Sequence, residues 1–143
     1  MSLINKTATE IRQQLLAEDI TPLDLLDAVE SRITEVEPSV NALPTLCFDR
    51  AREYAGNLMK KPLSERGMLA GLPVAVKDLD SVAGVRTTFG STIFSDFVPT
   101  ESDCLVDMVE KEDGVVYAKT DTCLLYTSPS PRDLSTSRMP SSA

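Results

Sequence analysis

Apolar residues recur every three or four positions near the start of the chain, and this spacing predicts an amphipathic helix. The stripe consists of Leu25, Leu26, Val29, Ile33 and Val36. Thr21 and Pro22 suit the N-cap and first turn of this helix, so we expect it to begin there. Because proline disfavours helical backbone in the residue before it, we expect Pro38 to end the helix. A stripe of this width indicates core packing rather than a docking face.

Capping signals and apolar spacing predict three further helices elsewhere in the chain. They are expected from a Thr7–Glu10 capping box to Leu16, over residues 48–60, and from a cap at Ser102 or Asp103 to a stop before Gly114. The charged residues that lie between the apolar positions of these segments suit solvent-facing sides of helices.

Two short apolar runs, residues 72–77 and 115–118, have the length and composition of buried strands. The first is opened by Gly71 and Pro73 and ends at Lys77. The helix predicted before Gly114 lies between them, which makes a strand–helix–strand unit, and such a unit favours a parallel pair. Residues 78–100 have no regular period and are expected to form a long loop of the kind that often carries function. The chain is therefore predicted to be α/β, with amino-terminal helices followed by a βαβ unit.

The pattern breaks after Thr122. Ser, Thr and Pro make up 11 of the 21 residues from 123 to 143, and no helical or alternating period continues. We therefore divide the chain into a patterned part, 1–122, and a tail, 123–143, that its composition predicts to be disordered. The tail also resembles a stretch found on many unrelated translated metagenomic fragments, where it is read-through of sequencing-adapter DNA. We expect it to be non-native and exclude it from reasoning about the fold.

Composition excludes several function classes. The formal net charge is −8, which argues against nucleic acid or anionic membrane as the main partner, and no apolar run is long enough to cross a membrane. The chain has no histidine, which excludes Ser-His-Asp catalysis and histidine-ligated zinc. Cys47, Cys104 and Cys123 show no metal or disulfide spacing, which favours a reducing cytoplasm. The single glycines form no phosphate-binding loop, so no cofactor or metal is predicted.

Lys77 is the strongest candidate for chemistry. It stands at the end of the apolar run Val74–Val76, where a strand delivers side chains to the edge of a sheet. A lysine acts as a base only when it is neutral, and burial against apolar residues disfavours its charged form. A lysine that closes a strand beside an aspartate such as Asp78 is more often a solvated, ion-paired surface residue, so the pattern alone leaves both interpretations open. Asp78 itself is expected to be structural, and Lys119 to end the second strand without acting as a second base.

Residues 1–122 resemble the amino-terminal part of amidase signature hydrolases, a family that includes the amidase subunit of the tRNA-dependent amidotransferase. The resemblance rests on residues 40–51, on Gly71-Leu-Pro-Val-Ala-Val-Lys77-Asp78 with its continuation through Gly90-Ser91, and on Gly114 to Thr122. The middle stretch is specific and the outer two support it. On this resemblance, residues 1–122 are an incomplete amidase domain, about a quarter of a full family member.

The resemblance implies an α/β fold around a mixed sheet and hydrolysis of a carboxamide C–N bond. The family's catalytic set is a lysine, a serine in an unusual cis peptide, and a nucleophilic serine. Only the lysine maps onto this chain, at Lys77, where it would take a proton from the bridging serine. The two serines belong to a Gly/Ser-rich segment, and no glycine follows Gly114 here. The parent protein is thus expected to be an amidase, and the chain as written to be inactive.

Two alternatives remain open at this point. The chain could belong to an amidotransferase A-type subunit that acts in a complex, although no basic or tRNA-contacting extension is visible. It could also be a truncated, non-enzymatic helical interaction module that uses the stripe from Leu25 to Val36 or its acidic surface. The expected partner of the parent is a small-molecule amide, and the resemblance leaves both a homo-oligomer and a partner subunit open.

Overall fold

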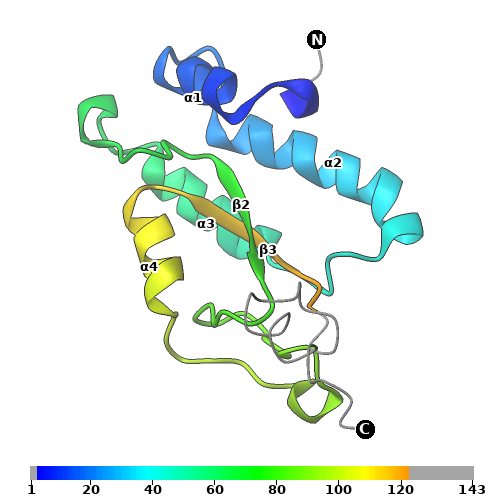
Figure 1. The fold of residues 1–143 in the computed structure, drawn as a ribbon. Helices are drawn as coiled ribbons and strands as arrows, with labels where there is room; N and C mark the ends of the chain where they lie inside the picture. Colours follow the sequence, from blue (N-terminus) through cyan, green and yellow to red (C-terminus); the bar gives the residue numbers. More distant parts are fainter. Residues whose placement is uncertain (1–2, 123–143) are drawn as a thin grey trace, which may run out of the picture.

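The computed structural model describes residues 3–122. Figure 1 shows helices gathered around a small central sheet, with α2 and α3 on one side and α4 on another. The predicted tail, 123–143, lies outside the described residues, so the structure does not test the expectation that it is disordered. Among the described helices, none combines the length and the apolar character that a membrane crossing requires.

The predicted helices and strands are present, with small shifts at their ends. The α-helices are α1 (Ala8–Leu16), α2 (Pro22–Val40), α3 (Phe48–Leu58) and α4 (Cys104–Lys111), the strands are β1 (Thr45–Leu46), β2 (Pro73–Lys77) and β3 (Val115–Thr120), and short 3-10 turns lie at Leu3–Asn5, Leu63–Glu65 and Thr92–Phe94.

Helix α2 begins as predicted but ends later. Thr21 caps it, and Thr21 and Asp24 form a capping box with Pro22 in the first turn. The prediction that Pro38 ends the helix is wrong, because α2 continues to Val40 and closes at Asn41, whose φ is 52°. Pro38 is exposed in the last turn. Proline has no amide hydrogen, so the carbonyl four residues before it loses its helical hydrogen bond. At this exposed end of the helix that carbonyl can bond water instead, so the proline costs less free energy than it would inside the helix.

The sheet has the order β1-β3-β2. Strands β2 and β3 are parallel, as the βαβ pattern predicted, and their register pairs Pro73 with Val115 and Lys77 with Thr120. Strand β1 lies antiparallel on the other side of β3, which makes the sheet mixed. It has only two residues, too few to give a periodic signal in the sequence.

Neighbouring valines of β3 point to opposite faces of the sheet and divide the core in two. Val115 packs with buried residues of α2 and α3, including Leu26 and Ile33. Val116 packs on the other side with Val106 of α4 and with apolar residues of β2 and the following loop. The stripe of α2 is therefore core, as predicted, and the interaction-module alternative loses that stripe as a docking face.

The long loop 78–100 is irregular, as predicted, but it is tied along its length. The amide of Gly84 donates to the carbonyl of Pro99 at 2.9 Å, and the amide of Thr87 donates to the carbonyl of Phe97 at 3.0 Å. Gly90 lies so close to the end of the described chain that a Cβ added to it would stand 2.5 Å from the carbonyl oxygen of Thr122. The loop is thus folded back against the region that follows β3.

The α2 cap can be tested on a synthetic peptide spanning residues 18–42. Hydrogen bonds from the side chain and then the backbone of Thr21 lower the pKa of Asp24. Ionised Asp24 therefore stabilises the helix fully at pH values above the ordinary pKa of an aspartate, about 3.9. This stabilisation is lost as the pH falls through the lowered pKa of Asp24 in the helix. By circular dichroism, Thr21→Ala should weaken the helix by about 0.5–1 kcal/mol. The wild-type and Asp24→Asn peptides should differ at neutral pH and converge in strong acid. Equal helicity of the three peptides at every pH would contradict a stabilising role of the Thr21–Asp24 capping box.

The close approach of the loop can be tested with two glycine variants that share the same backbone constraint. Gly90 and Gly84 have φ of +67° and +74°, but only Gly90 has backbone within 4 Å of an added Cβ. Gly90→Ala should therefore push the loop away from Thr122, whereas Gly84→Ala should cost only the strain of its φ. Hydrogen exchange at the amides of Thr87 and Thr88 should be about tenfold faster in Gly90→Ala than in Gly84→Ala. Equal exchange in both variants would show that the contact does not hold the loop.

Candidate functional site

The carboxyl ends of β2 and β3 lie side by side and form the edge at which the chain gathers its polar residues. Lys77 is the last residue of β2 and pairs with Thr120 of β3. The amide of Asp78 donates to the carbonyl of Thr120 at 3.0 Å, so the parallel pairing extends one residue beyond the strand. Sites in α/β proteins commonly lie beyond the carboxyl ends of parallel strands, which is where the sequence placed Lys77.

The pattern left burial or surface exposure of Lys77 open, and the structure shows its side chain exposed at the end of β2. The physical reason is the alternation of the strand, because Val76 and Asp78 turn inward and Lys77 between them turns outward. Among residues 3–122, the Lys77 ammonium has no hydrogen-bond or ion-pair partner.

Lys119 is the buried lysine of this site. Its side chain is fully buried in β3, and its ammonium lies 3.3 Å from a carboxylate oxygen of Asp78. It also donates to the carbonyl of Asp80 at 2.6 Å and to the hydroxyl of Thr87 at 2.9 Å. The sequence analysis placed Lys119 at the end of the strand and gave it no role. The signal that could have found it is its position directly after the apolar run Val115–Ala118, in a strand whose Val115, Val116 and Ala118 are also buried.

Asp78 has the structural role that was expected for it. Its side chain is 1% exposed and accepts hydrogen bonds from both the amide and the hydroxyl of Thr88. With the ammonium of Lys119 on its other side, the carboxylate joins the end of β2 to the middle of the long loop. Such a buried carboxylate is satisfied by a cation and two hydrogen-bond donors together.

Beyond Asp78, the loop 78–100 and the end of the described chain line an open pocket of about 300 Å³ that is rich in hydroxyl groups. It is lined by Pro44, Arg86, Thr88, Gly90, Ser91, Thr92, Ser95, Asp121 and Thr122. The guanidinium of Arg86 donates to the carbonyls of Ser95 and Pro44 at 2.9 and 2.8 Å. Arg86 thereby fixes the wall of the pocket, and the hydroxyls around it could bind a small polar group.

Of the cysteines in residues 3–122, neither Cys47 nor Cys104 lines this pocket. Burial raises the pKa of the Cys47 thiol, whose Sγ lies 3.7 Å from the carbonyl oxygen of Val116. Cys104 is exposed at the start of α4. Within residues 3–122, no three histidine, cysteine or acidic side chains are grouped so that they could hold a metal ion.

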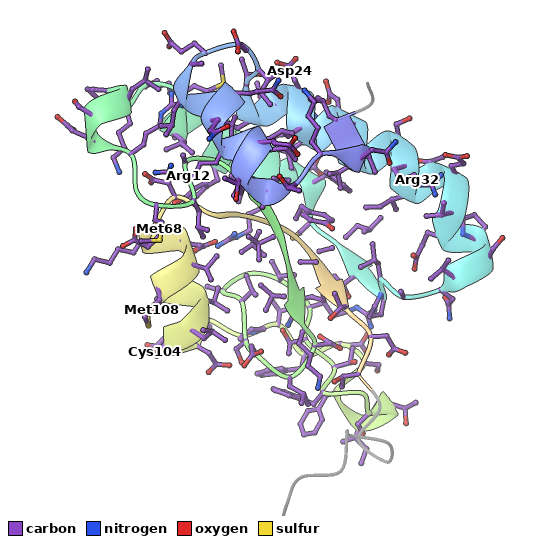
Figure 2. All side chains as sticks on the ribbon, turned by 45° about the horizontal axis from the view of Figure 1, so that its top comes forward. Arg12, Asp24, Arg32, Met68, Cys104 and Met108 are labelled. Atoms are coloured by element: carbon purple, nitrogen blue, oxygen red, sulfur yellow. The ribbon has the colours of Figure 1, made fainter. Side chains whose placement is uncertain are left out.

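A different face of the molecule is apolar and uncovered. Met68 is 70% exposed, and Leu105 and Met108 of α4 are each 60% exposed. Figure 2 shows Met68, Met108 and Cys104 along the same side of the molecule. Near the pocket, Ile93 is 86% exposed beside a cluster of three phenylalanines. Exposed apolar side chains that gather on one face, unlike single scattered ones, are typical of surfaces that other protein covers.

Comparison with known proteins adds the family to this geometry. The model of the Amidase family matches residues 24–132, a range that runs past Thr122. The A-type subunit of the glutamyl-tRNA(Gln) amidotransferase from Halothermothrix orenii is 36% identical over 121 residues, which are 85% of this chain and 24% of that protein.

Solved structures agree with the sequence match. A crystal structure of an amidase is 30% identical with a TM-score of 0.70, and covers 80% of this chain and 26% of its own. A bacterial aryl acylamidase of the amidase signature family has the same fold at 24% identity and a TM-score of 0.70, over 82% of this chain and 25% of its own. The chain thus spans about a quarter of the length of its relatives. With a family model matched over most of its length, the chain belongs to the Amidase family, a family of amide-hydrolysing enzymes.

Proposed function

We propose that this chain is the amino-terminal part of an enzyme that hydrolyses a carboxamide, with Lys77 as its catalytic base. The observation that supports this most is the position of Lys77, exposed at the carboxyl end of β2 in a chain of the Amidase family. Its side chain points away from the core while the residues on either side are held inward. A base has to present its amine to a reacting group in this way.

The mechanism follows from the resemblance of residues 71–91 to amidase signature hydrolases. Neutral Lys77 would accept a proton from a bridging serine in a cis peptide, and that serine would accept a proton from the nucleophilic serine as it attacks the amide carbonyl. Both serines would come from a Gly/Ser-rich segment that also supplies oxyanion-hole amides. We assign neither role to Ser128, Ser130 or Ser141, which lie outside the described residues and have no glycine beside them.

The same proposal holds that residues 1–122 are an incomplete domain and that 123–143 is a non-native tail. Two observations support incompleteness: the chain spans about a quarter of its relatives' length, and Met68, Leu105 and Met108 are exposed. In a complete domain, further chain would cover these side chains and would also desolvate Lys77, which the described residues leave open. A cytoplasmic location belongs to the proposal too, supported by the free cysteines Cys47 and Cys104.

An amidotransferase component is the second candidate. The observation in its favour is that two of the relatives, at 36% and 37% identity, are A-type subunits of glutamyl-tRNA(Gln) amidotransferases. In that case the complete protein would act with partner subunits rather than alone on a free small-molecule amide. Ammonia release that appears only after a partner protein is added would favour this candidate, and release by the complete protein alone would favour the free amidase.

The role of Lys77 is tested in the complete protein that carries residues 1–122. With a panel of a simple aliphatic amide, an aryl acylamide and glutamine, Lys77→Met should lower kcat by about 10²–10⁴-fold, because a general base contributes that much. The matched control is Lys111→Met, which removes another exposed lysine, at the end of α4. Full activity in Lys77→Met would refute the role, and equal losses in both variants would indicate an effect of charge alone.

The 143-residue chain itself should not hydrolyse these amides. Without the nucleophile, a catalytic set of this kind loses several orders of magnitude in rate.

Because an open sheet edge and apolar side chains stay uncovered, we also expect the purified chain to associate and to melt without a sharp transition. Calorimetry with sedimentation measures both properties. A monomer with a sharp cooperative melt would show that the fragment is a self-sufficient domain.

A further inference from the structure

The ion pair between Lys119 and Asp78 has no solvent contact on either side. The Lys119 side chain is 0% exposed and that of Asp78 is 1% exposed. The three partners of the Lys119 ammonium come from different places: Asp78 directly after β2, and Asp80 and Thr87 along the loop. One buried ammonium, carried by β3, therefore holds the end of β2 and two points of the loop.

Stability alone does not account for such a pair. Removing two charges from water costs several kcal/mol per ion, and well-packed apolar residues in the same volume are often as stable or more stable. The pair does, however, fix geometry, because the ammonium and carboxylate satisfy each other only in one arrangement. The question is which geometry is fixed, and the neighbouring residue is Lys77.

The backbone that follows Lys77 is held by this arrangement. Asp78, the next residue, is held by Lys119 and donates its amide to Thr120 at 3.0 Å. The carbonyl of Lys77 accepts from the amide of Asp80 at 3.0 Å, and the carbonyl of Asp80 is in turn bound by Lys119. The loop cannot shift without breaking these contacts, so the point from which the Lys77 side chain leaves the sheet is fixed.

We propose that Lys119 is a positioning residue that, through its buried ion pair with Asp78, fixes the backbone from which Lys77 presents its amine. This rests on the proposed function, in which Lys77 is the base. A displacement of about 1 Å in a catalytic group can cost about 10²-fold in rate, so a positioning role predicts a loss of kcat with little change in KM.

The test separates positioning from stability by removing both charges together in the complete protein. Lys119→Met alone leaves the Asp78 carboxylate buried without a cation and should lower Tm strongly. Lys119→Met with Asp78→Asn leaves no buried charge and keeps an amide oxygen for the Thr88 amide, so much of the Tm should return. With the fastest substrate of the amide panel, this double variant should still show kcat lowered by about 10²-fold.

A second ion pair provides the matched control. Arg50 and Glu110 join α3 to α4 at 2.6 Å, are partly buried, and lie on elements other than β2 and its loop. Arg50→Met with Glu110→Gln should leave kcat within about twofold of the wild type, because neither side chain touches β2, its loop or Lys119.

Thr87→Val covers the case in which the double variant fails to fold. It removes one hydrogen bond to Lys119 but keeps the ion pair, so Tm should change little and kcat should fall several-fold. A folded double variant with wild-type kcat, or Thr87→Val with wild-type kcat where the double variant does not fold, would overturn the positioning role. Failure of the proposed function is seen separately, as full activity in Lys77→Met with Lys119 intact.

Discussion

The parallel pairing of β2 with β3 is the constraint on which the rest of the described structure depends. It brings Lys77 beside Thr120 and places Lys119 beneath the loop that follows β2. It also lets Val115 and Val116 serve two separate cores, one under α2 and α3 and the other under α4. A change of register by one residue would exchange the two faces of β3 between these cores and bring Lys119 out of its contacts.

The two lysines at this edge differ in burial and in partners. Lys119 is buried and satisfied by Asp78, Asp80 and Thr87, whereas Lys77 is exposed and has no partner within the described residues. A lysine whose ammonium is already bound on three sides is suited to hold structure. A lysine on a fixed backbone whose amine has no partner among the described residues fits the base proposed for this family member.

Sequence reasoning predicted the helices and the parallel strands because their signals are local: caps at Thr7 and Thr21, and apolar runs before Lys77 and after Gly114. It missed β1, whose two residues carry no period, and it ended α2 too early because propensity at Pro38 ignores where in the helix the proline falls. It predicted that Lys77 ends the first buried strand, as it does, but missed the pairing of Lys119 with Asp78. That pair joins residues far apart in the chain, and only the register of the sheet brings them together.

The claim that this chain is the first quarter of an amide hydrolase is tested most directly by an independent long read of the source locus across codon 122. The account predicts that the reading frame continues past Thr122 into a Gly/Ser-rich segment that carries two serines, followed by about the length that the relatives have. If the Ser/Pro-rich tail of residues 123–143 and a stop codon are present in the genomic DNA instead, the chain cannot complete a catalytic set, and the account is contradicted.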